Sequence, residues 1–80
     1  MNKEFGRVAI SVVEPQGADG AAYHTRFERR DDIAAELKAE GVAILSRPTD
    51  SPTLVIACSG ETQRILPSLY SGVTVRTATL

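Results

Sequence analysis

The fold is decided by the stretch Asp31-Asp32-Ile33-Ala34-Ala35-Glu36-Leu37-Lys38-Ala39-Glu40-Gly41-Val42-Ala43-Ile44-Leu45, which changes from helical to strand character within one turn. Asp31 is a residue type preferred at helix N-caps, and most of residues 32–40 are good helix formers. Gly41 stands where a left-handed C-cap belongs, and residues 42–45 are typical of a short strand. A helix that leads directly into a strand predicts a fold in which helices pack on a sheet.

Two strands are predicted before this stretch. Residues 7–14 alternate in the manner of a strand and are rich in β-branched side chains. Residues 15–20 combine a proline with two glycines, so we expect the chain to reverse there. Residues 22–28 alternate again, with His24 and Arg26 on the polar side, which predicts a hairpin with one solvent-facing side.

Two strands and a helix are predicted after it. Residues 53–58 are apolar on both faces, which is typical of a central strand. A short helix should follow Ser59-Gly60, with Ile65, Leu66 and Leu69 on its inner side and a bend or end near Pro67. Residues 73–79 contain threonines and Arg76, which indicates an edge strand.

The predicted order is therefore β-β-α-β-β-α-β. We expect a single α+β domain over residues 1–80, in two layers, with a five-stranded antiparallel or mixed sheet and both helices on one face. From its second strand onward this order resembles the layout of ferredoxin-like domains. In that layout the strand before the first helix is paired on both sides, so a hairpin partner would clash with it. The strand order therefore stays open.

Composition narrows the class of partner. The net charge is −1, hydrophobic residues make up 42% and Cys58 is the only cysteine. These values fit a folded cytoplasmic domain with no disulfide, no metal site and no cofactor, and they do not favour direct nucleic-acid binding. The N-terminal residues carry acid and glycine in place of an apolar signal, and no apolar run has the ~20 residues that a membrane span requires.

A possible reactive loop spans residues 54–64. An apolar strand leads to Cys58, and Arg64 follows six positions later on the expected helix. This spacing resembles the active loop of cysteine-dependent phosphatases and, more loosely, of rhodanese-type sulfurtransferases. The resemblance implies Cys58 as nucleophile, Arg64 as oxyanion clamp and Asp50 as the one candidate general acid. Against it, the loop has one glycine, Gly60, and Glu61 would repel an anion. We expect Cys58 to be interior packing and the protein not to be an enzyme.

The densest basic patch is formed by Arg26, Arg29 and Arg30, followed by Asp31. On a solvent-facing strand and helix start, these four residues could contact a protein partner, and we assign them as the candidate binding site. The alternative is that they only form local ion pairs. His24 is the only histidine, and we expect it to face solvent.

In length, stand-alone character and α+β layout, the chain resembles the small anti-CRISPR inhibitors that bacteriophages make against type I interference complexes. The resemblance rests on size and layout and transfers no functional residue. It implies a non-catalytic inhibitor, monomeric or dimeric, that covers a nucleic-acid-binding surface of a host effector subunit. The alternatives are the Cys58 enzyme and a dimeric regulatory or assembly domain joined through residues 73–79.

Overall fold

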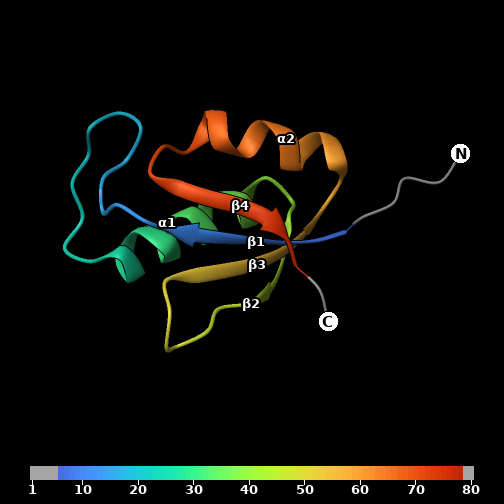
Figure 1. Ribbon diagram of the computed structural model, residues 1–80, viewed down its shortest axis with the longest axis horizontal. Coiled ribbons are helices and arrows are strands. Elements are labelled where there is room, and N and C mark those ends of the chain that lie inside the picture. Colours follow the sequence, from blue (N-terminus) through green and yellow to red (C-terminus); the bar gives the residue numbers. More distant parts are fainter. Residues whose placement is uncertain (1–5, 79–80) are drawn as a thin grey trace, which may run out of the picture.

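The computed structural model describes residues 6–78, which form four strands and two helices. In chain order these are β1 (Gly6–Val12), α1 (Arg26–Ala39), β2 (Ala43–Ser46), β3 (Thr53–Cys58), α2 (Gly60–Leu69) and β4 (Val73–Thr77). The order β-α-β-β-α-β is the one that ferredoxin-like domains share. Figure 1 shows the sheet with α1 behind it.

The sheet is fully antiparallel, with the strand order β2-β3-β1-β4. The prediction of an α+β fold is confirmed, but the prediction of five strands is wrong. β1, the strand before the first helix, is paired on both sides, by β3 and by β4, so it has no room for a hairpin partner. β3 is interior and β4 is an edge strand, as their sequences indicated.

The predicted strand over residues 22–28 does not form. Its only sheet-like contact is an isolated bridge between Gln16 and Ala22, and α1 begins at Arg26. Thr25 caps the helix, because its Oγ1 accepts a hydrogen bond from the Glu28 N–H at 3.0 Å. The prediction of Asp31 as N-cap is therefore wrong, and Asp31 lies inside the helix.

The C-terminus of α1 follows the prediction closely. Gly41 has φ +91°, and its N–H donates to the Lys38 carbonyl at 3.0 Å. The Val42 N–H donates to the Leu37 carbonyl at 2.9 Å. These two bonds form a Schellman motif, which ends the helix and directs the chain into β2.

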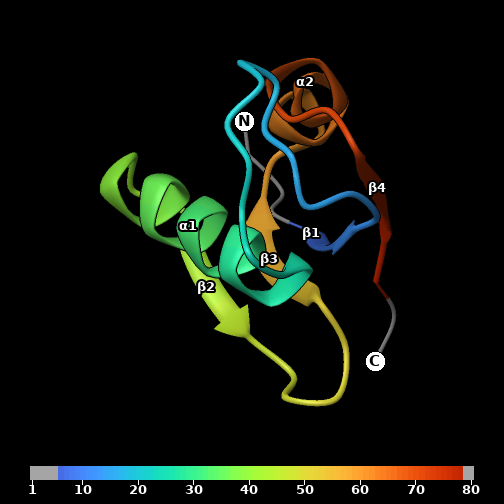
Figure 2. The same cartoon turned by 90° about the vertical axis from the view of Figure 1, so that its left-hand side faces the viewer.

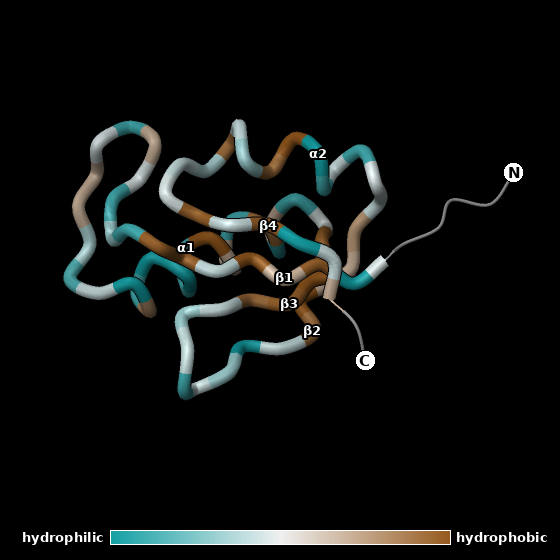
Figure 3. The backbone as a smooth tube through the Cα atoms, in the orientation of Figure 1, coloured by the Kyte–Doolittle hydropathy of each residue, from teal (hydrophilic) through white to brown (hydrophobic). Residues whose placement is uncertain are grey.

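The buried residues form one cluster between the sheet and the helices. It contains one face of β1 and β3 together with residues of both helices: Val8, Ile10, Val12, Ile33, Ala34, Leu37, Leu54, Ile56, Cys58 and Leu66. Both helices therefore cover the same face, as Figure 2 shows. In Figure 3 the hydrophobic residues follow β1 and β3, whereas the loops are largely hydrophilic. Within residues 6–78, no helix covers the opposite face of the sheet.

The second helix contributes less to this cluster than expected. Leu66 is its only buried residue, whereas Ile65 and Leu69 are each 52% exposed. The prediction that all three face inward is wrong. Pro67 lies inside the helix, which continues to Leu69. At its end the Tyr70 hydroxyl donates to the Glu36 carboxylate at 3.2 Å, linking α2 to α1. Burial, followed by the negative charge of Glu36, raises the pKa of Tyr70 to about 12.

Candidate functional site

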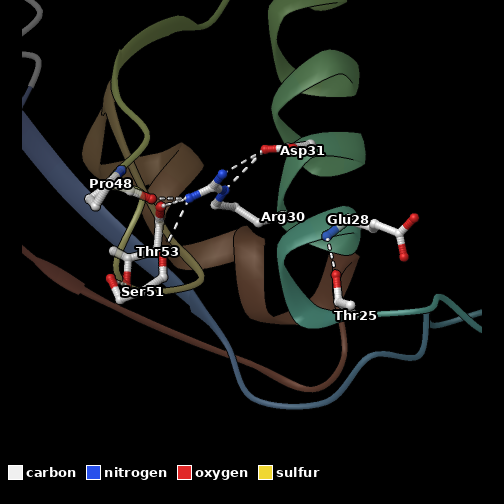
Figure 4. A network of polar contacts seen from close by, with 7 residues as sticks. All are labelled: Thr25, Glu28, Arg30, Asp31, Pro48, Ser51 and Thr53. Carbon is white, nitrogen blue, oxygen red and sulfur yellow. Dashed lines mark hydrogen bonds and ion pairs between the residues drawn. The ribbon is translucent and has the colours of Figure 1, made fainter.

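The arginine cluster expected to contact a partner is largely internal. Arg30 is 7% exposed and lies on the inner side of α1. Its guanidinium donates to the backbone carbonyls of Pro48 and Ser51 in the loop between β2 and β3 and of Thr53 at the start of β3 (Figure 4). It also forms an ion pair with Asp31, with 2.9 Å between Nη2 and Oδ1. Arg30 thus holds that loop against the helix.

Arg29 has a similar internal role at the same end of the sheet, on the side of β4. It is 1% exposed, and its Nη1 donates to the Glu14 carbonyl at 3.0 Å. Gly72 lies directly over this contact: a Cβ on Gly72 would be 3.0 Å from Nη1 of Arg29. Arg29 therefore ties α1 to the chain that leaves β1 and to the turn that enters β4.

Arg26 and Asp31 are the two exposed residues of the predicted site. The carboxylate of Asp31 is already paired with Arg30. The assigned surface of Arg26, Arg29, Arg30 and Asp31 is therefore not a continuous binding surface, since two of its four members are buried. Reversing Arg29 and Arg30 to glutamate would damage the fold, so this change cannot serve as a test of binding.

The Cys58 loop does not have the geometry of an oxyanion cradle. Cys58 is 3% exposed and belongs to the core cluster, and burial raises the pKa of its thiol, which disfavours the thiolate. The Ser59 hydroxyl occupies the N-terminus of α2, where it accepts a hydrogen bond from the Thr62 N–H at 3.2 Å. Arg64, His24 and Asp50 are exposed. The described residues contain no cluster of three or more metal-ligating side chains.

A different surface is presented by the side of the sheet away from the helices, which we call the open face. The pairing registers place ten residues on it: Arg7, Ala9, Ser11, Ala43, Ser46, Thr53, Val55, Ala57, Thr74 and Arg76. Most of these side chains are small. The Ser11 and Thr53 hydroxyls are 3.1 Å apart and bond to each other across the β1–β3 pair. The open face is consequently flat, with a polar end and an apolar centre.

The charged side chains of the four strands lie on the open face, and both are positive. Arg7 and Arg76 are the only charged residues in the four strands, and both lie on this face. Arg76 is opposite Ala9, and the Arg7 carbonyl accepts from the Ala78 N–H, so the two arginines are diagonal neighbours on β1 and β4. Both are exposed, and neither has an ion-pair partner among residues 6–78. They form an unpaired cationic pair at one side of the face.

A hollow lies at the opposite edge of the sheet, between α1 and β2. It has a volume of about 730 Å³, and we call it the α1–β2 groove. Its lining includes Ala34, Ala35 and Lys38 from the helix and the segment from Val42 to Arg47. A smaller hollow of about 240 Å³ lies between the two helices and the loop that precedes α1.

Neither of the two main surfaces was identified from the sequence. Arg7 and Arg76 are separated by most of the chain, and only the β1–β4 pairing brings them together. A usable signal was present, because they are the two charged residues at the non-core positions of otherwise uncharged strands. The groove depends on the angle between α1 and β2, which no sequence pattern gives.

No protein-family model, curated protein or solved structure matches the chain. The function is therefore argued from the surfaces described above. Among residues 6–78, neither helix combines the length and the apolar character needed to cross a membrane.

Proposed function

We propose that the protein is a small non-catalytic binding domain that acts by covering an acidic surface of a larger protein with its open face. The observation that carries the proposal is the pair Arg7 and Arg76, two cations with no ion-pair partner among residues 6–78, on a sheet face that has no carboxylate in its strands. Small side chains around them allow close approach, and charge of one sign selects an acidic partner.

The charge of the open face favours a different protein as the partner over a second copy of this chain. Four strands about 4.8 Å apart, each about five residues long, give a face of roughly 300 Å². A stable interface buries about 800 Å² on each partner, so contacts must extend onto the rim. Two copies placed face to face would also bring four arginines together without a counter-charge. An acidic partner would instead attract both arginines.

A protein partner is also favoured over a nucleic acid. Single-stranded nucleic acids are bound by aromatic side chains on which the bases stack, together with an extended basic surface. Of the four aromatic residues, Tyr23, Phe27 and Tyr70 lie outside the strands, and Phe5 is outside the described residues. Within residues 6–78 the open face offers two arginines and no ring.

The most specific form of the proposal is an anti-CRISPR inhibitor that covers a nucleic-acid-binding surface of a type I effector subunit. Size and layout motivate it. It predicts that the purified protein prevents a type I effector complex from binding its target DNA. Undiminished DNA binding at saturating protein rejects this identity and leaves the broader binding role to be tested separately.

The broader role is tested by photo-crosslinking in cells that express the protein. A photoreactive amino acid at Thr74, on the open face, should capture a specific partner, whereas the same amino acid at exposed Ser68 on α2 should not. Arg7→Glu combined with Arg76→Glu should remove the adduct, and Arg64→Glu, an exposed arginine off the face, should leave it. Equal capture from Thr74 and Ser68 would refute the assignment.

Two other roles make distinct predictions. A Cys58 enzyme requires a thiol that reacts near neutral pH, whereas its burial predicts slow alkylation in the native protein and fast alkylation in urea. A regulatory dimer joined through the β4 edge would sediment at twice the monomer mass, and a proline at Thr77, whose N–H points away from β1, would dissociate it.

A further inference from the structure

We propose that the α1–β2 groove binds a short, extended segment of a partner polypeptide, which adds to the outer edge of β2 and presents both apolar and acidic side chains to the groove. This site is separate from the open face, and its existence does not depend on the function proposed above. The argument rests on the backbone of β2, the side chains that line the groove and their charge.

The direction of the backbone groups in β2 follows from the hydrogen bonds of β1. The Arg7 carbonyl accepts from the Ala78 N–H at 2.8 Å, so Arg7 directs its backbone groups toward β4. In an antiparallel sheet this direction alternates from one residue to the next. Val8 therefore directs its groups toward β3, and Val8 and Ile56 form a hydrogen-bonded pair.

The same alternation continues through β3 to the edge. Because Ile56 faces β1, Ala57 directs its backbone groups to β2, where it is paired with Ala43. Ile44, the next residue, must then direct its N–H and C=O away from the sheet, along the groove. A strand edge with unbonded groups is the surface to which an extended peptide adds.

The side chains beside this edge leave room for a peptide. Ala34, Ala35 and Ala43 are small, which accounts for a groove of about 730 Å³ between two packed elements. Val42 and Ile44 are partly buried and pack against the core, while Leu45 is 47% exposed. Alternate residues of an added strand point to the same side, so every second side chain of the peptide would enter the groove.

The charge of the lining selects acidic residues at some of these groove-facing positions. Lys38 and Arg47 line the groove, and neither forms an ion pair within the described part of the chain. Asp31 also lines it, but its carboxylate is paired with Arg30. The groove therefore presents two uncompensated cations, one on the helix and one just after β2.

The bulge in β2 limits the length of the occupant. The β2–β3 register shifts between Ile44 and Ser46, which leaves Leu45 as an extra residue. A bulge bends a strand and interrupts a regular ladder. A short segment that pairs around Ile44 fits this edge, whereas a long flat strand does not. Joining β2 to β2 in a second copy would also place Lys38 and Arg47 of both chains together.

The test uses an acetylated peptide in which every second residue is valine or glutamate in turn, with threonine between them, titrated into ¹⁵N-labelled protein and followed by NMR. Saturable shifts are expected at Ile44, Leu45 and Ala35, together with slower hydrogen exchange of the Ile44 amide. A matched peptide of valine and lysine should bind about tenfold more weakly or not at all. Shifts confined to the open face, or no saturable shift, would overturn the proposal.

Two variants locate the site. Ala35→Leu fills the groove from the exposed side of α1 and should abolish binding, whereas Ala39→Leu, one turn further and outside the lining, should not. Lys38→Glu combined with Arg47→Glu should reverse the preference toward the lysine peptide. Unchanged preference refutes the assigned charges. Arg7→Glu with Arg76→Glu should leave peptide binding intact, which separates this site from the open face.

Discussion

The inner side of α1 and the open face of the sheet each carry two arginines and use them for opposite purposes. Arg29 and Arg30 are buried and bond to backbone carbonyls of distant loops. Arg7 and Arg76 are exposed on the open face and have no ion-pair partner in residues 6–78. The difference lies in what surrounds each guanidinium. The first pair serves the fold, and the second is available to a partner.

The two buried arginines also differ from each other in the number of acceptors to which they donate hydrogen bonds. Arg30 donates to three carbonyls and one carboxylate, whereas Arg29 is bonded to the single carbonyl of Glu14. A buried charge is stabilising only where its donors are satisfied. We therefore expect Arg30 to contribute more than Arg29 to the free energy of unfolding.

The largest effect is expected from Arg30→Ala. The substitution leaves the carbonyls of Pro48 and Ser51 without their donor and removes the guanidinium that lies 5.2 Å from the centre of the Phe27 ring. The free energy of unfolding should fall by about 3 kcal/mol, a large share of what an 80-residue domain has. Urea denaturation measures the change. Arg26→Ala is the control, and an equal loss in both variants would contradict the internal role.

A smaller loss is expected from Thr25→Ala. Thr25 fixes where α1 begins, and this start places Arg29 and Arg30 on the inner side of the helix. Loss of the cap should lower the free energy of unfolding by about 1 kcal/mol. Thr49→Ala, in the exposed loop after β2, is the matched control. If both variants unfold at the same urea concentration, the cap does not stabilise the helix.

Arg29→Met tests the difference between the buried arginines. Methionine keeps most of the apolar volume and removes the charge, so the lost bond to Glu14 is offset by the avoided desolvation of a guanidinium that has no ion pair. The change should stay within about 1 kcal/mol. Arg30→Met should cost clearly more in the same urea titration. The reverse order would show that the number of bonded carbonyls does not determine the contribution.

The smallest effect is expected on the open face. Arg7→Ser combined with Arg76→Ser should change the free energy of unfolding by no more than about 0.5 kcal/mol. The wild type should gain a little stability with salt, which screens the repulsion between the two diagonal arginines, and the variant should not. Thermal denaturation at low and high salt measures both. A loss comparable to that of Arg30→Ala would mean that this pair belongs to the fold.

Much of the fold could be predicted from local patterns. Thr53–Cys58 was predicted with the bounds that the structure has, because an apolar run ends abruptly at Ser59-Gly60. Gly41 marked the end of α1 because its positive φ favours glycine. Both features depend on a few neighbouring residues, which is where sequence patterns are most informative.

The failures share a physical cause. The alternation of Tyr23, Thr25 and Phe27 with other residues favours a strand over residues 22–28, and counting Arg29 and Arg30 as polar delays the expected helix start to Asp31. The buried positions 29, 30, 33, 34 and 37 follow a helical period once the stems of Arg29 and Arg30 count as apolar. Thr25 and Glu28 have the spacing of a capping box, a signal that was available. The site failed for the same reason, since its arginines face inward.

The contact between Arg30 and the loop that follows β2 uses only main-chain oxygens of the loop. These hydrogen bonds do not depend on which side chains the loop carries. Thr49 and Asp50, both exposed, can therefore be exchanged freely while the loop keeps its shape. These two positions are suited to carrying a fluorescent label or an affinity handle that leaves both candidate surfaces undisturbed.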